Sequence, residues 1–105
     1  MERLRRVLIA SADESGRVAI RAAARRAGFR ICGYAKTAAD AVSRARRTQP
    51  DICLLDLDLP GGSMQAAGEI AAELPTVGVV VLADFPSASA SWCTAQRRNG
   101  LVVVN

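Results

Sequence analysis

The fold of this chain is decided by one stretch, Ile52-Cys53-Leu54-Leu55-Asp56-Leu57-Asp58-Leu59-Pro60-Gly61-Gly62. The stretch begins with a short apolar run, which follows Pro50 and is closed downstream by a Pro-Gly-Gly sequence. An apolar run between such breakers predicts a buried strand that leads into a loop. Asp56 lies where this strand ends, at the edge of the sheet where open α/β folds place their chemistry. A carboxylate held there can act as a nucleophile toward a phosphoryl group.

Predicted strands and helices alternate along the chain up to residue 83. Apolar, β-branched runs predict strands at residues 6–10, 29–34, 52–56 and 77–82. Helical spacing and breaker residues predict helices at residues 15–27, from Thr37 or Asp40 to about 48, and at about 63–74. Regular alternation of this kind predicts a parallel sheet with right-handed crossovers and helices on both faces. The expected fold class is therefore α/β, an open doubly wound parallel sheet.

The pattern changes at Asp84. Residues 85–91 are poor in leucine, isoleucine and valine, residues 92–99 predict one weak helix, and residues 101–104 predict a fifth strand. The sequence contains no further helix that would cover this strand. We therefore expect one domain over residues 1–105, with an atypical part at 84–105 and an incomplete C-terminal region.

Composition narrows the possible chemistry. The 105 residues contain no histidine, which excludes histidine-based triads and imidazole metal sites. Cys32, Cys53 and Cys93 fit neither a zinc spacing nor a disulfide framework, and Cys53 is expected to be a small buried hydrophobic residue. No apolar stretch is long enough to cross a bilayer, and the N-terminus does not have the pattern of a signal peptide. We expect a soluble, cytoplasmic protein with no membrane partner.

Positive charge is the other feature of the composition, with a formal net charge of +4. Arg17, Arg21 and Arg25 recur every four residues and would form one stripe on a helix. A solvated helix face explains this stripe better than a nucleic-acid surface, because no aromatic residues are interleaved with it. Nucleic acid is therefore not expected as a partner of this domain itself.

The order and spacing of several short motifs resemble the receiver domain of bacterial two-component response regulators. The resemblance runs from about residue 6 to residue 83 and is carried by Val7-Leu8-Ile9-Ala10, Ala27-Gly28-Phe29, Gln49-Pro50-Asp51 and Leu54-Leu55-Asp56-Leu57-Asp58-Leu59-Pro60-Gly61. It implies a flavodoxin-like receiver fold. By the same resemblance, Asp56 matches the phospho-accepting aspartate and a Mg²⁺ ligand. Asp58 matches the position whose backbone carbonyl helps to hold Mg²⁺, and Pro60-Gly61 matches the turn that shapes the loop.

The sequence departs from the receiver pattern at the residues that support phosphorylation. Receivers usually have two acidic residues directly after the first strand, but this chain has Ser11 and Ala12 there. Asp13 follows too late to match and is at most a weak metal ligand. Ala83 occupies the position of the phosphate-sensing serine or threonine, and no lysine follows Lys36 to pair with a phosphorylated aspartate. Because Mg²⁺ in such sites is held by one or two carboxylates, only weak Mg²⁺ binding is expected.

Several functions are compatible with these residues. The chain is expected to be a receiver-like module of two-component phosphorelay signalling, either phosphorylated on Asp56 by a sensor histidine kinase or acting without phosphate through another protein partner. A homodimer is left open. The alternatives are a truncated remnant without function and a haloacid-dehalogenase-like phosphatase built on Asp56 and Asp58. Pro60 and the missing downstream lysine argue against the phosphatase. No catalytic residues are therefore assigned, and no enzymatic activity is expected.

Overall fold

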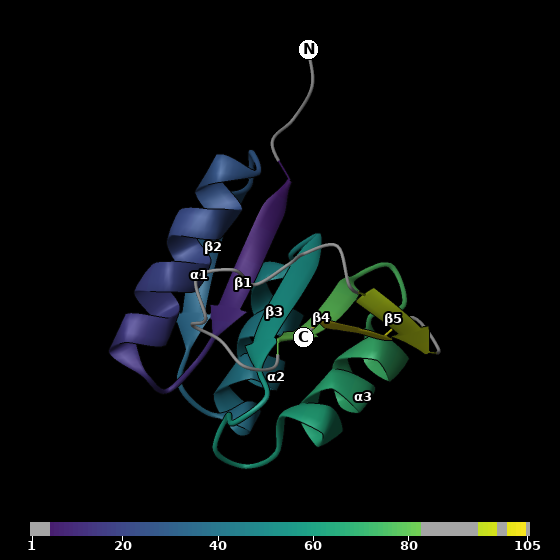
Figure 1. The fold of residues 1–105 in the computed structure, drawn as a ribbon. Helices are drawn as coiled ribbons and strands as arrows, with labels where there is room; N and C mark the ends of the chain where they lie inside the picture. The colour runs from purple at the N-terminus through teal and green to yellow at the C-terminus, as the bar shows by residue number, and fades with distance from the viewer. Residues whose placement is uncertain (1–4, 83–94, 99–100, 105) are drawn as a thin grey trace.

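The computed structural model describes residues 5–82, 95–98 and 101–104. In this part of the chain, a six-stranded sheet has the order β2-β1-β3-β4-β6-β5 (Figure 1). The strands are β1 (Arg6–Ala10), β2 (Arg30–Ala35), β3 (Ile52–Asp56), β4 (Gly78–Leu82), β5 (Ala95–Arg98) and β6 (Leu101–Val104). The helices are α1 (Glu14–Arg26), α2 (Ala38–Thr48) and α3 (Ser63–Glu73). All the strand pairs are parallel except β5 with β6. The predicted α/β class with an open, doubly wound parallel sheet is confirmed.

The C-terminal strands confirm one prediction and correct another. Residues 101–104 form the expected strand, β6, which pairs in parallel with β4. The weak helix predicted at residues 92–99 is wrong where the structure describes it, because residues 95–98 form β5, antiparallel to β6. Arg98 pairs with Leu101, and the sequence between them is Asn99-Gly100, a dipeptide that favours two-residue hairpins. Pairing with β5 satisfies backbone groups that β6 would otherwise leave open at the sheet edge. Residues 92–94 and 99 of that predicted helix lie outside the described residues.

Each of the first two helices begins at a capping side chain. The Asp13 carboxylate accepts a hydrogen bond from the backbone N–H of Gly16 at 2.9 Å, at the start of α1. Thr37 caps α2 in the same way, with its hydroxyl oxygen 3.1 Å from the backbone nitrogen of Asp40. Such caps satisfy N–H groups that have no partner inside the helix. The choice between Thr37 and Asp40 is thereby decided, since Thr37 is the cap and Asp40 lies in the first turn.

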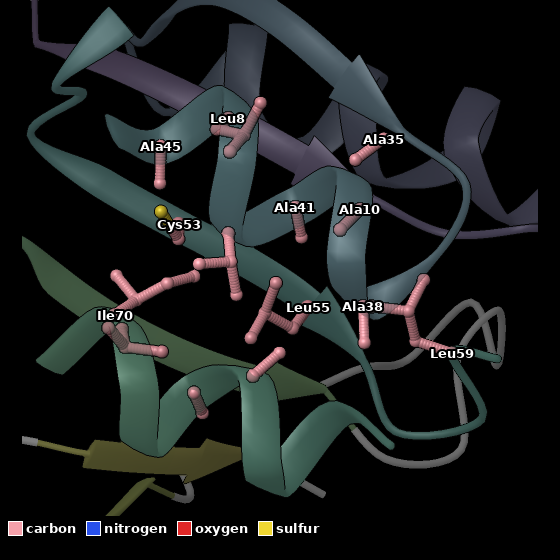
Figure 2. Packing of buried hydrophobic residues seen from close by; sticks show 14 of the residues in the cluster. Leu8, Ala10, Ala35, Ala38, Ala41, Ala45, Cys53, Leu55, Leu59 and Ile70 are labelled. Carbon is pink, nitrogen blue, oxygen red and sulfur yellow. The ribbon is translucent and has the colours of Figure 1, made fainter. Parts of the chain in front are cut away.

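The core has two parts, one on each face of the sheet. On one face, side chains of β1 and β3 such as Leu8, Cys53 and Leu55 pack against α2 and α3 (Figure 2). Helix α2 contributes mainly alanines to this contact, namely Ala38, Ala41 and Ala45. On the other face, Ile20 and Ala24 of α1 pack against the sheet. Beside α1 this face has an apolar groove of about 560 Å³, lined by Val7, Ala23, Ala24, Arg26, Ala27, Phe29, Ile52, Leu54 and Val80.

Cys53 is fully buried, as the sequence predicts. Burial, with a smaller contribution from Cys32, raises the pKa of the Cys53 thiol from 9.0 to about 12. Because the folded state favours the neutral thiol, this preference stabilises the fold below about pH 9, and the stabilisation is lost as the pH rises toward 12. The thiolate is the reactive form of cysteine. We therefore expect Cys53 to resist iodoacetamide in the native protein at mildly alkaline pH and to react fully in urea.

Mass spectrometry of tryptic peptides measures this reactivity, with the half-buried Cys32 as an internal comparison. Labelling of Cys53 in the native protein at the rate seen in urea would show that the thiol is not enclosed as described.

Candidate functional site

The candidate site lies at the carboxyl ends of β1 and β3, where Ser11 contacts Asp56. Ala10 at the end of β1 is opposite Leu55 of β3, so the next residues of the two parallel strands, Ser11 and Asp56, also come together. The Ser11 hydroxyl donates a hydrogen bond to Oδ2 of Asp56 at 3.0 Å. Ser11 is fully buried and Asp56 is half-buried. The carboxylate is therefore fixed from the β1 side and keeps part of its surface open to solvent.

The second carboxylate oxygen of Asp56 is held by the loop that follows it. The backbone N–H of Asp58 donates to Oδ1 of Asp56 at 3.1 Å, and the backbone N–H of Leu59 donates to the Asp56 carbonyl at 3.0 Å. Both carboxylate oxygens thus accept a hydrogen bond from the protein. The Asp58 residue itself is exposed. Asp58 comes to the site through its backbone, and its own carboxylate makes no described contact with Asp56.

The turn at Pro60 and Gly61 fixes the far end of this loop. Gly61 has a φ of +94°, and the N–H of Gly62 donates to the carbonyl of Leu59 at 3.1 Å. Proline followed by a glycine of positive φ fits a type II turn. The Pro60 carbonyl accepts a hydrogen bond from the N–H of Ala38 at 2.8 Å, so the turn is attached to the start of α2.

Ser63 has a role that sequence reasoning does not predict. The Gly-Gly-Ser sequence predicts a turn with a helix cap, but Gly62 stands at the cap position and no side chain caps α3. Ser63 is the buried first residue of the helix, and its hydroxyl donates to the carbonyl of Leu57 at 2.8 Å. Ser63 therefore anchors the loop that follows Asp56 and donates the Asp58 N–H to its carboxylate.

Helix α1 brings Arg17 to the same edge of the sheet. The guanidinium of Arg17 donates from Nη1 to the carbonyls of Ser11 at 3.0 Å and of Ala12 at 3.2 Å. Arg21 and Arg25, the other members of the predicted stripe, are exposed as expected for a solvated face. Arg17 departs from that interpretation, since it is half-buried and bound to the backbone next to the site.

The remaining predicted site residues are not brought to Asp56 in the described structure. Asp13 uses Oδ2 for its own helix, accepting from the N–H of Gly16 at 2.9 Å and from the Ser15 hydroxyl at 3.0 Å. Among the residues that the structure describes, no three histidine, cysteine or acidic side chains lie together in a way that would hold a metal ion. Ala83, at the predicted phosphate-sensing position, lies outside the described residues.

Comparison with solved structures places this fold among receiver domains. The chain is 25% identical to the signal receiver domain of the response regulator NarL from Mycobacterium tuberculosis, with a TM-score of 0.70 over 82% of this chain and 73% of that one. It is 26% identical to a LuxR-family two-component response regulator from an Aurantimonas species, with a TM-score of 0.69 over 77% of this chain and 59% of that one. The response regulator domain of Thermotoga maritima CheB shares the fold at 21% identity and a TM-score of 0.69, over 85% of this chain and 67% of that one.

The resemblance to receiver domains is therefore confirmed for the fold. Protein-family models give no match to the chain, and neither do curated proteins compared by sequence. Within the described residues, the structure has no helix that is both long and apolar enough to cross a membrane.

Proposed function

We propose that this chain, which has the fold of a response-regulator receiver domain, is a receiver-like module of two-component signalling that binds a protein partner without phosphate on Asp56. The observation that carries this proposal is the hydrogen bond from the buried Ser11 hydroxyl to the Asp56 carboxylate. Receivers usually have an acidic, metal-binding residue at the position of Ser11. In this chain a neutral donor at that position stabilises the unmodified carboxylate.

Phosphoryl transfer depends on positioning and on neutralisation of the charge that develops in the transition state. In this chain the usual acidic pair is Ser11 and Ala12, and the last lysine in the sequence is Lys36. Asp56 is half-buried, with both oxygens already bonded to donors of the protein. The nucleophile is present, but the groups that would activate its phosphorylation are replaced, which favours a binding module over a phosphorylation switch.

The fold and the exposed apolar side chains at and after the end of β3 support a protein as the partner. Leu57, directly after Asp56, is 42% exposed, and Met64 in the first turn of α3 is 47% exposed. A sensor histidine kinase or another protein of the same signalling system is the partner that we propose. A second copy of the chain is the alternative, and we propose no catalytic activity for the module itself.

The test compares the parent chain with Asp56→Ala and Asp56→Asn. We expect intact-mass spectrometry to show no added phosphoryl group on the parent after incubation with acetyl phosphate and Mg²⁺. We also expect tagged parent and both variants to recover the same two-component protein in equal amount from cells. A phosphoryl group gained by the parent and absent in Asp56→Asn would contradict the proposal, and so would loss of the partner in both variants.

Phosphorylation of Asp56 is the second candidate function. It is favoured by the place of this carboxylate at the end of β3, part of it open to solvent, and by the Asp58 N–H that orients Oδ1. Under this hypothesis a kinase supplies the phosphoryl group, and the added charge shifts a two-state surface of the domain. The mass measurement with acetyl phosphate decides between the two candidates.

The two remaining alternatives are less well supported. A haloacid-dehalogenase-like phosphatase needs two cooperating carboxylates, whereas the described contact of Asp58 with Asp56 is through the backbone. A non-functional remnant would be expected to unfold without cooperativity. A cooperative, reversible thermal transition of the monomer would count against the remnant.

A further inference from the structure

We propose that the site around Asp56 works without a divalent cation, because the Ser11 hydroxyl and the Arg17 guanidinium take up the groups that would bind one. This inference rests on the proposed function in that it treats Asp56 as the centre of the site. Mg²⁺, which the receiver fold implies, does not fit the residues that are present. Three features of the site support this, namely the atoms facing Asp56, the positive charge bound to the loop after β1 and the carboxylate on that loop.

The atoms that face the Asp56 carboxylate are donors. Oδ2 faces the hydroxyl of Ser11 at 3.0 Å and Oδ1 faces the N–H of Asp58 at 3.1 Å. Mg²⁺ requires several oxygen acceptors in octahedral geometry and gives up its waters reluctantly. Ser11 is fully buried, so its hydroxyl has few other partners, the nearest described one being the Asp13 carbonyl at 3.4 Å. The neutral serine thus contributes a donor where an ion would need an anionic ligand.

A positive charge is bound to the loop after β1, at the backbone of Ser11 and Ala12. Arg17 binds the carbonyls of Ser11 and Ala12 through one nitrogen, at 3.0 and 3.2 Å. These carbonyls belong to the loop after β1. A metal ion bound at this loop would need them as ligands, but they already accept hydrogen bonds from Arg17. A guanidinium is always protonated and repels a divalent cation, so its position disfavours a metal there.

The only carboxylate on the loop after β1, that of Asp13, belongs to the start of α1. Its Oδ2 accepts from the N–H of Gly16 at 2.9 Å, and a Cβ on Gly16 would lie only 3.1 Å from Oγ of Ser11. The first turn of α1 therefore packs directly on Ser11, and the cap keeps Asp13 with its own helix. Asp13 is thus oriented by the first turn of α1, with Oδ2 bonded to Gly16 and Ser15.

Paramagnetic Mn²⁺, which binds like Mg²⁺ to oxygen ligands, tests the inference on the full chain. We expect the amide NMR spectrum of the parent to show no selective loss of the signals of residues 11 and 56–58 when Mn²⁺ is added. The variant Ser11→Asp/Ala12→Asp is expected to lose these signals at equimolar Mn²⁺, because it adds two carboxylates beside Asp56. Adding Arg17→Gln to this variant is expected to make the loss occur at still lower Mn²⁺.

The matched control is Ala39→Asp/Ser43→Asp, which adds the same charge on exposed positions of α2 and should leave the signals near Asp56 intact. Selective loss in the parent that disappears in Asp56→Asn would overturn the inference, whether or not the carboxylate variant folds. The inference and the proposed function are tested by different measurements. Mn²⁺ binding, seen by NMR, requires no phosphoryl group, whereas phosphorylation of Asp56 is detected by mass spectrometry alone.

Discussion

Replacing Leu55 with alanine is expected to lower the free energy of unfolding by about 2–5 kcal/mol. Leu55 is 0% exposed and lies in β3, between the strand partners β1 and β4 and under α2 and α3 (Figure 2). Removing its side chain costs the transfer free energy of the lost carbons and leaves a cavity in the core. Because small domains are stable by only about 5–15 kcal/mol, this variant should lose a large part of its stability. Urea denaturation followed by circular dichroism measures the effect.

Leu57→Ala is the matched control, because it makes the same chemical change two residues further along the chain. Leu57 is 42% exposed, so its truncation should change stability by no more than about 0.5 kcal/mol. Equal losses in the two variants would contradict the burial of Leu55 and the exposure of Leu57.

Replacing Gly61 with alanine is the second change expected to have a large effect. The φ of +94° at Gly61 is costly for any residue with a Cβ, by about 1–2 kcal/mol. The new Cβ would also lie 3.1 Å from Cβ of Ala38, which is tighter than an ordinary contact. The neighbouring Pro60 carbonyl accepts a hydrogen bond from the N–H of Ala38. The strain would therefore weaken the hydrogen bond that attaches the loop to the start of α2. A lower urea midpoint with an unchanged slope is the expected result.

Gly68→Ala is the matched control, because the same substitution is expected to raise stability at this position. Gly68 lies in α3 and is exposed, and a methyl group added there would meet no atom within 4 Å outside its own stretch of helix. Alanine is favoured over glycine inside a helix, so stability should rise by about 0.5–1 kcal/mol. A stabilising effect of Gly61→Ala, or equal effects at both glycines, would contradict the description of the turn.

Most of the fold could be predicted because each strand and helix in the first part of the chain has its own local boundary signals. The predicted strand at residues 6–10 and the end of the third strand at Asp56 agree with β1 and β3. The helix predicted at residues 15–27 is shifted by one residue from α1, and the one predicted at about 63–74 ends one residue after α3. Strand β5 escapes sequence reasoning because Gln96-Arg97-Arg98 has no apolar alternation, and its strand conformation depends on pairing with β6. Local propensity does not contain such a long-range pairing.

The candidate site could be predicted only in part, and for a related reason. Asp56 could be found because a local pattern places it at the end of a buried strand. The contact from Ser11 is set by the parallel register of β1 and β3, which joins residues 45 positions apart in the sequence. The sequence predicts that Arg17 belongs to a solvated stripe of arginines. Because α1 packs on the sheet, the guanidinium of Arg17 instead binds the loop after β1.

The most direct test of the central claim is an amide NMR spectrum of the purified chain with and without beryllofluoride and Mg²⁺. Beryllofluoride mimics the phosphoryl group of an aspartyl phosphate. We expect a well-dispersed spectrum in which the signals of Ser11 and of residues 56–58 stay in place, since Asp56 is already held by Ser11 and the site does not suit a divalent cation. Shifts centred on Asp56 that require both reagents would contradict it and would identify a metal-dependent receiver that can still be switched.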